Sequence, residues 1–148
     1  MKILDFVQGS EEWFKVRAGV PSASNFDKII TTKGEPSKQR TKYLWQLAGE
    51  RITGMPEESY QNANMQRGIE MEAEARNLYK VINELDVAEV GFCLADGKHK
   101  YGASPDGLVG ADGGVEIKCP DSTTHIDTLR GATIDGGYLK QIHWNMAC

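Results

Sequence analysis

Apolar positions in the first half of the chain recur at the spacing of helices. The spacing predicts one helix from Ser37 to about Ile52, ended by Gly54 and Pro56, and another from about Met65 to Leu85. In the second of these helices the apolar positions step by four and three residues. They form a stripe that we expect to lie in the core: Met71, Ala75, Leu78, Ile82 and Leu85.

Two shorter helices are predicted ahead of these. Ser10 is a candidate N-cap for a helix from Glu11 to about Ala18, and Ser22 or Ser24 can cap a second helix that ends near residue 30. A glycine and a proline interrupt the segment that follows, so a loop is expected between residues 31 and 37.

The second half of the chain is predicted to be rich in short strands. The turn sequences Asp96-Gly97 and Gly110 to Gly114 separate the candidate strands, and a last helix is expected from Tyr138 to Cys148. The strand-like segments are Val87 to Leu94, Tyr101 to Ala103, Leu108 to Val109 and Val115 to Cys119. Helices followed by hairpins indicate an α/β or α+β fold, and no repeat or linker divides residues 1–148, so we expect a single domain.

Composition narrows the class of protein. With 40% hydrophobic and 26% charged residues in 148, the chain is predicted to be globular, without a membrane span or a secretory signal, and cytoplasmic. Three widely spaced cysteines, Cys93, Cys119 and Cys148, fit reduced thiols better than disulfides or a metal cluster. The net charge of −4 argues against a nucleic-acid partner, unless several acids bind a cation that reverses the local field.

The stretch from Ser104 to Pro120 carries the most specific candidate chemistry. If its turn centres on Asp112 and Gly113 adopts the left-handed conformation, Asp106 lies opposite Lys118 and diagonal to Glu116. The charged side chains then share one face, and the apolar set points to the other: Val115, Ile117 and Cys119.

Two carboxylates so placed can hold Mg²⁺ and leave coordination positions for water and a substrate phosphate, which is an arrangement for hydrolysis. The same residues also fit a solvated hairpin in which Lys118 pairs with Asp106 or Glu116, worth at most about 1 kcal/mol. The spacing alone therefore leaves both interpretations open.

Pro105-Asp106 followed by Glu116-Ile117-Lys118 resembles the motif of the PD-(D/E)xK nuclease superfamily. Four segments together are similar to the phage lambda exonuclease and YqaJ-type viral recombinase family: "EEWFKVRAGVPSASNF", "RGIEMEAEAR", "SPDGL" and "EIKCP". The resemblance covers about Gln8 to Met146, nearly the whole chain.

The resemblance implies a restriction-endonuclease-like core with a mixed central β-sheet flanked by helices. It implies a Mg²⁺-dependent exonuclease, with Mn²⁺ able to substitute and two metal positions, that digests double-stranded DNA ends from 5′ to 3′. The products are mononucleotides and 3′ single strands for homologous recombination in a phage or prophage, with a phage single-strand annealing protein as partner. The family also implies a ring-shaped trimer and helices beyond Met146, which the chain ending at Cys148 is expected to lack.

Position by position, the resemblance assigns roles to nine residues. Asp106, Glu116 and the carbonyl of Ile117 correspond to metal ligands, and Lys118 corresponds to the catalytic lysine. Glu72 corresponds to a helical acid near the second metal, and Gln141 to a glutamine near the site. A pocket for the 5′-terminal phosphate is implied at three residues, each of which is otherwise an ordinary surface, cap or turn residue: Arg17, Ser24 and Ser104.

Two other functions share these residues. A structure-specific or restriction-type endonuclease would use the same acids and lysine without gripping a terminal phosphate. A catalytically silent module that binds DNA ends would have no chemical need for the complete set of Asp106, Glu116 and Lys118. We therefore expect the exonuclease.

Overall fold

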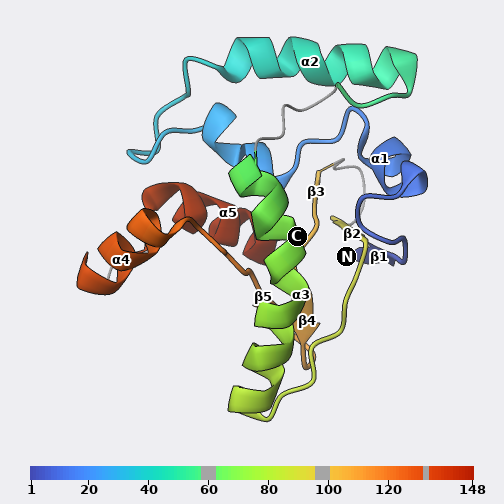
Figure 1. Cartoon of the computed structure of the whole chain (residues 1–148). Helices are drawn as coiled ribbons and strands as arrows, with labels where there is room; N and C mark the ends of the chain where they lie inside the picture. Colours follow the sequence, from blue (N-terminus) through green and yellow to red (C-terminus); the bar gives the residue numbers. More distant parts are fainter. Residues whose placement is uncertain (58–62, 96–100, 132–133) are drawn as a thin grey trace. The chain divides into compact units, whose positions relative to one another are not determined.

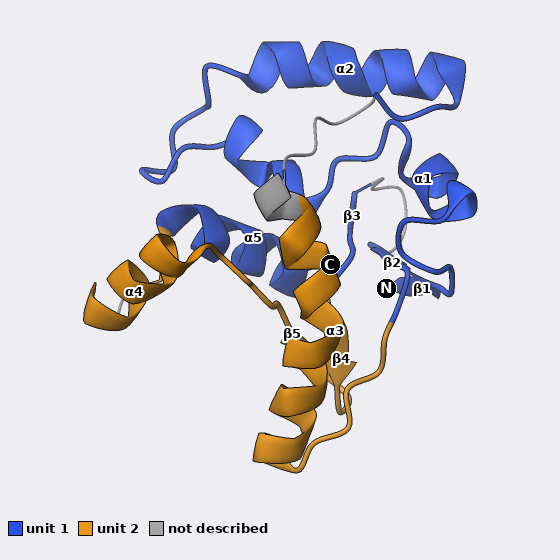
Figure 2. Ribbon diagram, viewed as in Figure 1, with its two compact units in different colours: residues 1–58, 90–105, 136–148 blue, residues 59–89, 106–135 orange. Residues whose placement is uncertain are grey.

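The computed structural model describes residues 1–57, 63–95, 101–131 and 134–148 (Figure 1). The chain divides into two compact units, coloured in Figure 2. Unit 1 comprises Met1–Glu58, Val90–Pro105 and Gly136–Cys148, and unit 2 comprises Ser59–Glu89 and Asp106–Asp135. The single domain over residues 1–148 stays a prediction.

The helices of unit 1 follow the sequence closely. α1 spans Glu11–Arg17, and the Ser10 hydroxyl accepts the N–H of Trp13 at 3.2 Å, so the predicted N-cap is confirmed. Ser22 precedes a 3₁₀ helix, η1, over Ala23–Lys28. α2 spans Arg40–Thr53 and α5 spans Gly136–Ala147. Gly54 ends α2 in the left-handed conformation that a helix-terminating glycine supplies, with φ +70°.

The carboxylate of Glu50 fastens α2 to the connection that follows α1. Glu50 is 9% exposed, and its Oε2 accepts the N–H of Gly19 at 2.9 Å. Gly19 has φ +69°, and a Cβ at this position would lie 2.7 Å from Cβ of Arg51. Gly19 therefore both ends α1 and allows the chain to approach α2 closely.

A three-stranded antiparallel sheet completes unit 1. β1 (Lys2–Leu4), β2 (Phe92–Leu94) and β3 (Gly102–Ala103) pair in that order, with Cys93 opposite Ile3 on one side and Ala103 on the other. Phe92, Cys93 and Ala103 are at most 1% exposed and form the centre of the core. β1 was not predicted, because three residues at the chain start are too few for a periodic signal. The predicted turn at Asp96-Gly97 lies outside the described residues.

Unit 2 consists of a long helix, a hairpin and a short helix. α3 spans Ala63–Asn83, β4 (Gly107–Val109) pairs with β5 (Gly113–Val115), and α4 spans Ser122–Gly131. α4 was not predicted. Its sequence signal is Asp121, whose carboxylate accepts the N–H of Thr124 at 2.9 Å, as a capping residue does. With these helices and antiparallel strands, the α/β class is confirmed.

The predicted pairing of the hairpin was wrong by two residues. Val109 lies opposite Gly113, and Gly110, with φ +61°, takes the left-handed position that we expected for Gly113. Gly113 instead belongs to the ladder, where a Cβ would lie 2.6 Å from the Val109 carbonyl oxygen. The ladder ends at Gly107 opposite Val115, so Asp106 and Glu116 lie just beyond its last pair, and the strand ends at Val115 instead of continuing to Cys119.

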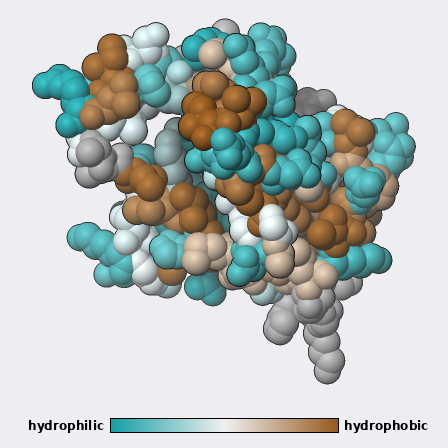
Figure 3. Space-filling model, turned by 90° about the horizontal axis from the view of Figure 1, so that it is seen from below, coloured by the Kyte–Doolittle hydropathy of each residue, from teal (hydrophilic) through white to brown (hydrophobic). Residues whose placement is uncertain are grey.

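The apolar stripe of α3 was wrongly predicted to be core. Its larger members are exposed, with Leu78 at 59% and Ile82 at 69%. The buried side chain of the helix is Arg76, because its guanidinium binds main-chain and carboxylate oxygens of unit 2. Exposed apolar residues occur elsewhere too, and the face drawn in Figure 3 carries several hydrophobic patches.

Among the residues that the structure describes, no helix is both long and apolar enough to span a membrane.

Gly91, next to β2, offers a test of this packing. A Cβ there would lie 2.2 Å from the Phe6 carbonyl oxygen and 2.7 Å from that of Leu4, and neither main-chain atom can move without opening the sheet. We expect Gly91→Ala to lower the free energy of unfolding by roughly 1–3 kcal/mol, measured by urea denaturation. Gly49→Ala is the control, because Gly49 lies within α2 with open space around it, and we expect it to raise stability by up to about 1 kcal/mol. Equal stability of the two variants would contradict the packing described for Gly91.

Candidate active site

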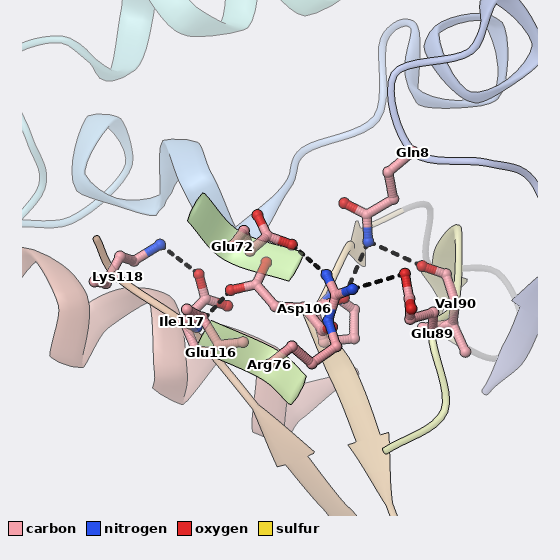
Figure 4. Close-up of polar contacts among 10 residues, drawn as sticks. Gln8, Glu72, Arg76, Glu89, Val90, Asp106, Glu116, Ile117 and Lys118 are labelled. Carbon is pink, nitrogen blue, oxygen red and sulfur yellow. Dashed lines mark hydrogen bonds and ion pairs between the residues drawn. The ribbon is translucent and has the colours of Figure 1, made fainter. Parts of the chain in front are cut away.

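Asp106 lies immediately before β4, and unit 2 holds it at three points. Its N–H donates to the Val115 carbonyl at 3.1 Å, and its own carbonyl accepts Nε of Arg76 at 2.8 Å. Its carboxylate oxygen Oδ2 accepts the N–H of Ile117 (Figure 4). The next residue, Gly107, packs where a Cβ would lie 2.1 Å from Cγ1 of Val87. Both the main chain and the side chain of Asp106 are therefore fixed.

Glu116 and Lys118 lie just after β5, where the ladder has ended. Their side chains form an ion pair between Nζ of Lys118 and Oε1 of Glu116 (Figure 4). The Glu116 side chain is 8% exposed and that of Lys118 is 34% exposed. Of the two pairings that the sequence left open for Lys118, the structure shows the one with Glu116.

Glu72 reaches the same cluster from α3. Its carboxylate pairs with Nη2 of Arg76, one turn further along the helix (Figure 4). Two contacts bring this part of the helix to the segment that follows Lys118. Nη1 of Arg67 donates to the Pro120 carbonyl at 3.0 Å, and the main chain at Gly68 lies against the Cys119 carbonyl. The structure thus brings Glu72, Asp106, Glu116, Ile117 and Lys118 together in unit 2.

The carboxylate of Asp106 is held where negative charge is costly. Burial raises its pKa to about 6, and the N–H of Ile117 opposes this rise. The negative charges of Glu116 and Glu72 raise the pKa further, and the positive charge of Lys118 lowers it. A bound cation would relieve the repulsion among the acids.

The donor set fits a hard divalent cation. Its side chains offer carboxylate oxygens, the ligand type that Mg²⁺ prefers, and Mg²⁺ needs only one or two of them in addition to water and substrate oxygens. Within the described ranges, no group of three or more His, Cys, Asp and Glu side chains is placed to hold a metal ion. The arrangement that fits is therefore the pair Asp106 and Glu116 with the main chain of Ile117.

Arg17 and Ser104 of the predicted phosphate pocket lie in unit 1 and are linked through Trp13. The Trp13 indole N–H donates to Oγ of Ser104 at 3.1 Å and to the Gly91 carbonyl at 2.9 Å. The Arg17 guanidinium carbon lies 3.7 Å from the centroid of the same indole ring. One tryptophan therefore positions both residues.

Arg17 is a half-buried cation whose Nε has no hydrogen-bond partner among the described residues. The Nε atom itself is buried. Burial lowers the pKa of Arg17 to about 10, against the opposing influence of Tyr43 and Glu50. The guanidinium is thus placed as an anion-binding group would be.

Ser24 and Gln141 complete the predicted residues of unit 1. Ser24 is exposed at the start of η1, with its Oγ 3.2 Å from Oγ of buried Ser22, which bridges to Gly102 two residues before Ser104. Gln141 is half-buried on α5. Both residues belong to unit 1, whereas Glu72, Asp106 and Glu116 belong to unit 2.

Trp13 and Arg76 were missed as parts of the candidate sites. The sequence assigned Trp13 no role, although its spacing of four residues from Arg17 on one helix was a usable signal. The same spacing relates Glu72 and Arg76 on α3. Neither spacing indicates a bond to a residue distant in the sequence, such as Ser104 or Asp106.

Comparison with known proteins finds similar crystal structures and a matching family. Two crystal structures of LHK-Exo, an alkaline exonuclease from Laribacter hongkongensis, are similar to it over 94% of this chain and 68% of theirs, each with a TM-score of 0.83. The sequence identity is 41% for the complex with dAMP and 40% for the other structure. No match is found among curated proteins. The likeness to LHK-Exo confirms the PD-(D/E)xK restriction-endonuclease-like class, and the profile of the YqaJ-like viral recombinase domain matches residues 12–148. The chain belongs to the family of YqaJ-like viral recombinase domains.

Proposed function

We propose that this chain is a metal-dependent exonuclease that digests double-stranded DNA ends from 5′ to 3′, releasing mononucleotides and leaving 3′ single strands for phage-type recombination. The family and the likeness to LHK-Exo support a nuclease that acts on DNA. The observation that carries the proposal is the half-buried carboxylate of Asp106 beside Glu116 and Lys118. LHK-Exo was crystallised with dAMP, and a mononucleotide of this kind is what such a reaction would release.

The metal would be Mg²⁺, with Mn²⁺ able to take its place. Asp106, Glu116 and the Ile117 carbonyl would hold one ion, and Glu72 would lie near a second. When bound, such ions lower the pKa of a coordinated water and offset charge on the phosphate in the transition state.

Lys118 and Gln141 act beside the metal ligands in this proposal. Nζ of Lys118, paired with Glu116, carries a positive charge that can orient the attacking water or stabilise negative charge on the phosphate oxygens. Gln141 would contribute amide hydrogen bonds near the site.

Recognition of a 5′ end would fall to Arg17, Ser24 and Ser104. The support is the buried Arg17 Nε, which has no partner among the described residues, and the indole that links Arg17 with Ser104. A guanidinium and two hydroxyls suit the oxygens of a terminal phosphate. An enzyme that cuts within a strand has no need of such a pocket, which favours the exonuclease over an endonuclease.

The proposal also covers the location, the oligomeric state and the protein partner of the chain. The chain would act in the cytoplasm of a bacterial host, as a homotrimer, and pass its 3′ strands to a phage single-strand annealing protein.

The acids and the lysine can be tested on a linear duplex with 5′ phosphates. We expect Glu116→Ala and Lys118→Ala each to slow the release of acid-soluble nucleotides by about 10²–10³-fold, because each removes a group that acts on the reacting phosphate. A chelator should abolish the wild-type activity, and Mg²⁺ or Mn²⁺ should restore it. Asp112→Ala is the matched control, since this acid is exposed on the loop of the same hairpin. Wild-type rates in either of the first two variants would refute the proposed site.

The end pocket can be tested by comparing 5′-phosphate with 5′-hydroxyl ends. We expect Arg17→Gln to reduce the preference for phosphate by about 10-fold to 100-fold in kcat/KM, the range that corresponds to a lost hydrogen bond to a charged group. Lys15→Gln on the same helix is the control, because Lys15 is exposed and pairs with Glu11. Covalently closed circular DNA should remain intact with the wild-type protein. Rapid cutting of the circle would instead support the endonuclease.

A further inference from the structure

Arg76 on α3 binds three oxygen atoms of unit 2 from a buried position. It is 8% exposed. Its Nε donates to the Asp106 carbonyl at 2.8 Å, its Nη1 pairs with Oε2 of Glu89 at 2.7 Å, and its Nη2 pairs with Oε1 of Glu72 (Figure 4). The nitrogens of one rigid guanidinium are thus divided among residues from three separate segments.

The contact with Asp106 is made to the main chain and not to the carboxylate. Arg76 therefore fixes where the residue lies, while the N–H of Ile117 directs the carboxylate. An arginine bound directly to the carboxylate would compete with a cation for the same oxygens. The observed bond positions the ligand without occupying it.

The contact with Glu72 is made by a different nitrogen of the same side chain, and it engages one of the two carboxylate oxygens, Oε1. Because a guanidinium is planar and its donors have fixed directions, binding both residues restricts the separation of Glu72 from Asp106. Arg76 thus holds Asp106 and Glu72, which are distant in the sequence, at a restricted separation.

The contact with Glu89 is weaker evidence of function. Its side chain is 72% exposed, and an exposed ion pair contributes little. The functional role of Arg76 is therefore argued from its contacts with Asp106 and Glu72.

We propose that Arg76 is a positioning residue of the metal site, which holds Asp106 and Glu72 at the separation that gives the divalent cation its affinity. This inference rests on the proposed function, because it takes Asp106 and Glu72 to lie at the metal positions. A lysine keeps the charge but has a single nitrogen, so it should not hold both Asp106 and Glu72 in the same positions.

Direct binding of Mn²⁺ in the absence of DNA tests the inference. We expect Arg76→Lys and Arg76→Met to raise the Kd for Mn²⁺, measured by isothermal titration calorimetry, by about 10-fold to 100-fold, the usual effect of losing a group that orients metal ligands. In exonuclease assays the Mg²⁺ concentration for half-maximal rate should rise in parallel, while KM for DNA stays close to the wild-type value. Thermal unfolding followed by circular dichroism establishes that each variant is folded.

Arg67→Met and Glu89→Gln are the controls. Arg67 lies on the same helix and also donates to a main-chain carbonyl, that of Pro120 at 3.0 Å, but it is exposed and contacts neither acid in the described residues. Glu89→Gln removes only the exposed partner of Arg76. Both controls should bind Mn²⁺ with the wild-type Kd.

The outcomes separate this inference from the proposed function. Wild-type Kd values for Mn²⁺ in folded Arg76 variants would overturn the positioning role and leave the proposed function intact. Failure of both Arg76 variants to fold would also overturn it, because Arg76 would then serve the fold as a whole. A wild-type protein that binds no Mn²⁺ would overturn the metal-dependent function, and this inference with it.

Discussion

The arrangement of unit 2 depends on one half-buried carboxylate. Asp106 lies immediately before β4, where burial and the charges of Glu116 and Glu72 all disfavour its ionised form. An ionised acid in such a place needs compensation by hydrogen bonds or opposite charge. The N–H of Ile117 provides part of it, and the charge of Lys118 provides another part. The remaining repulsion is what a bound cation would relieve.

The pairing of the hairpin determines which charges oppose each other. With Gly107 opposite Val115 as the last pair, Asp106 and Glu116 lie just beyond the ladder, and the negative charge of Glu116 disfavours the ionised form of Asp106. The pairing expected from the sequence would have placed Lys118 opposite Asp106 and formed an ordinary ion pair. The observed pairing instead brings two acids together and leaves Lys118 to bind Glu116. The observed pairing thus differs by two residues from the expected one.

Unit 1 holds the complementary chemistry. Arg17 is a half-buried cation that stacks on Trp13, and its Nε has no partner within the described part of the chain. In unit 2 the negative charges of Glu116 and Glu72 act on Asp106, and a cation would relieve their repulsion. In unit 1 the Nε of Arg17 could donate to an anion. The net charge of −4 is therefore a poor guide to partners, because what matters is how the charges are grouped.

By itself the sequence determined the family, most of the helices and the residue types of the site. Helices α1, α2, α3 and α5 were predictable because caps, glycine stops and apolar spacing act within a few residues. The family resemblance, and not spacing alone, singled out Asp106, Glu116, Lys118 and Glu72 as one group. Only the tertiary structure decided the hairpin pairing, the exposure of the α3 stripe and the bonds of Trp13 and Arg76. Each of these depends on contacts between segments far apart in the sequence, such as the one from Arg76 to Asp106, and no local periodicity records such contacts.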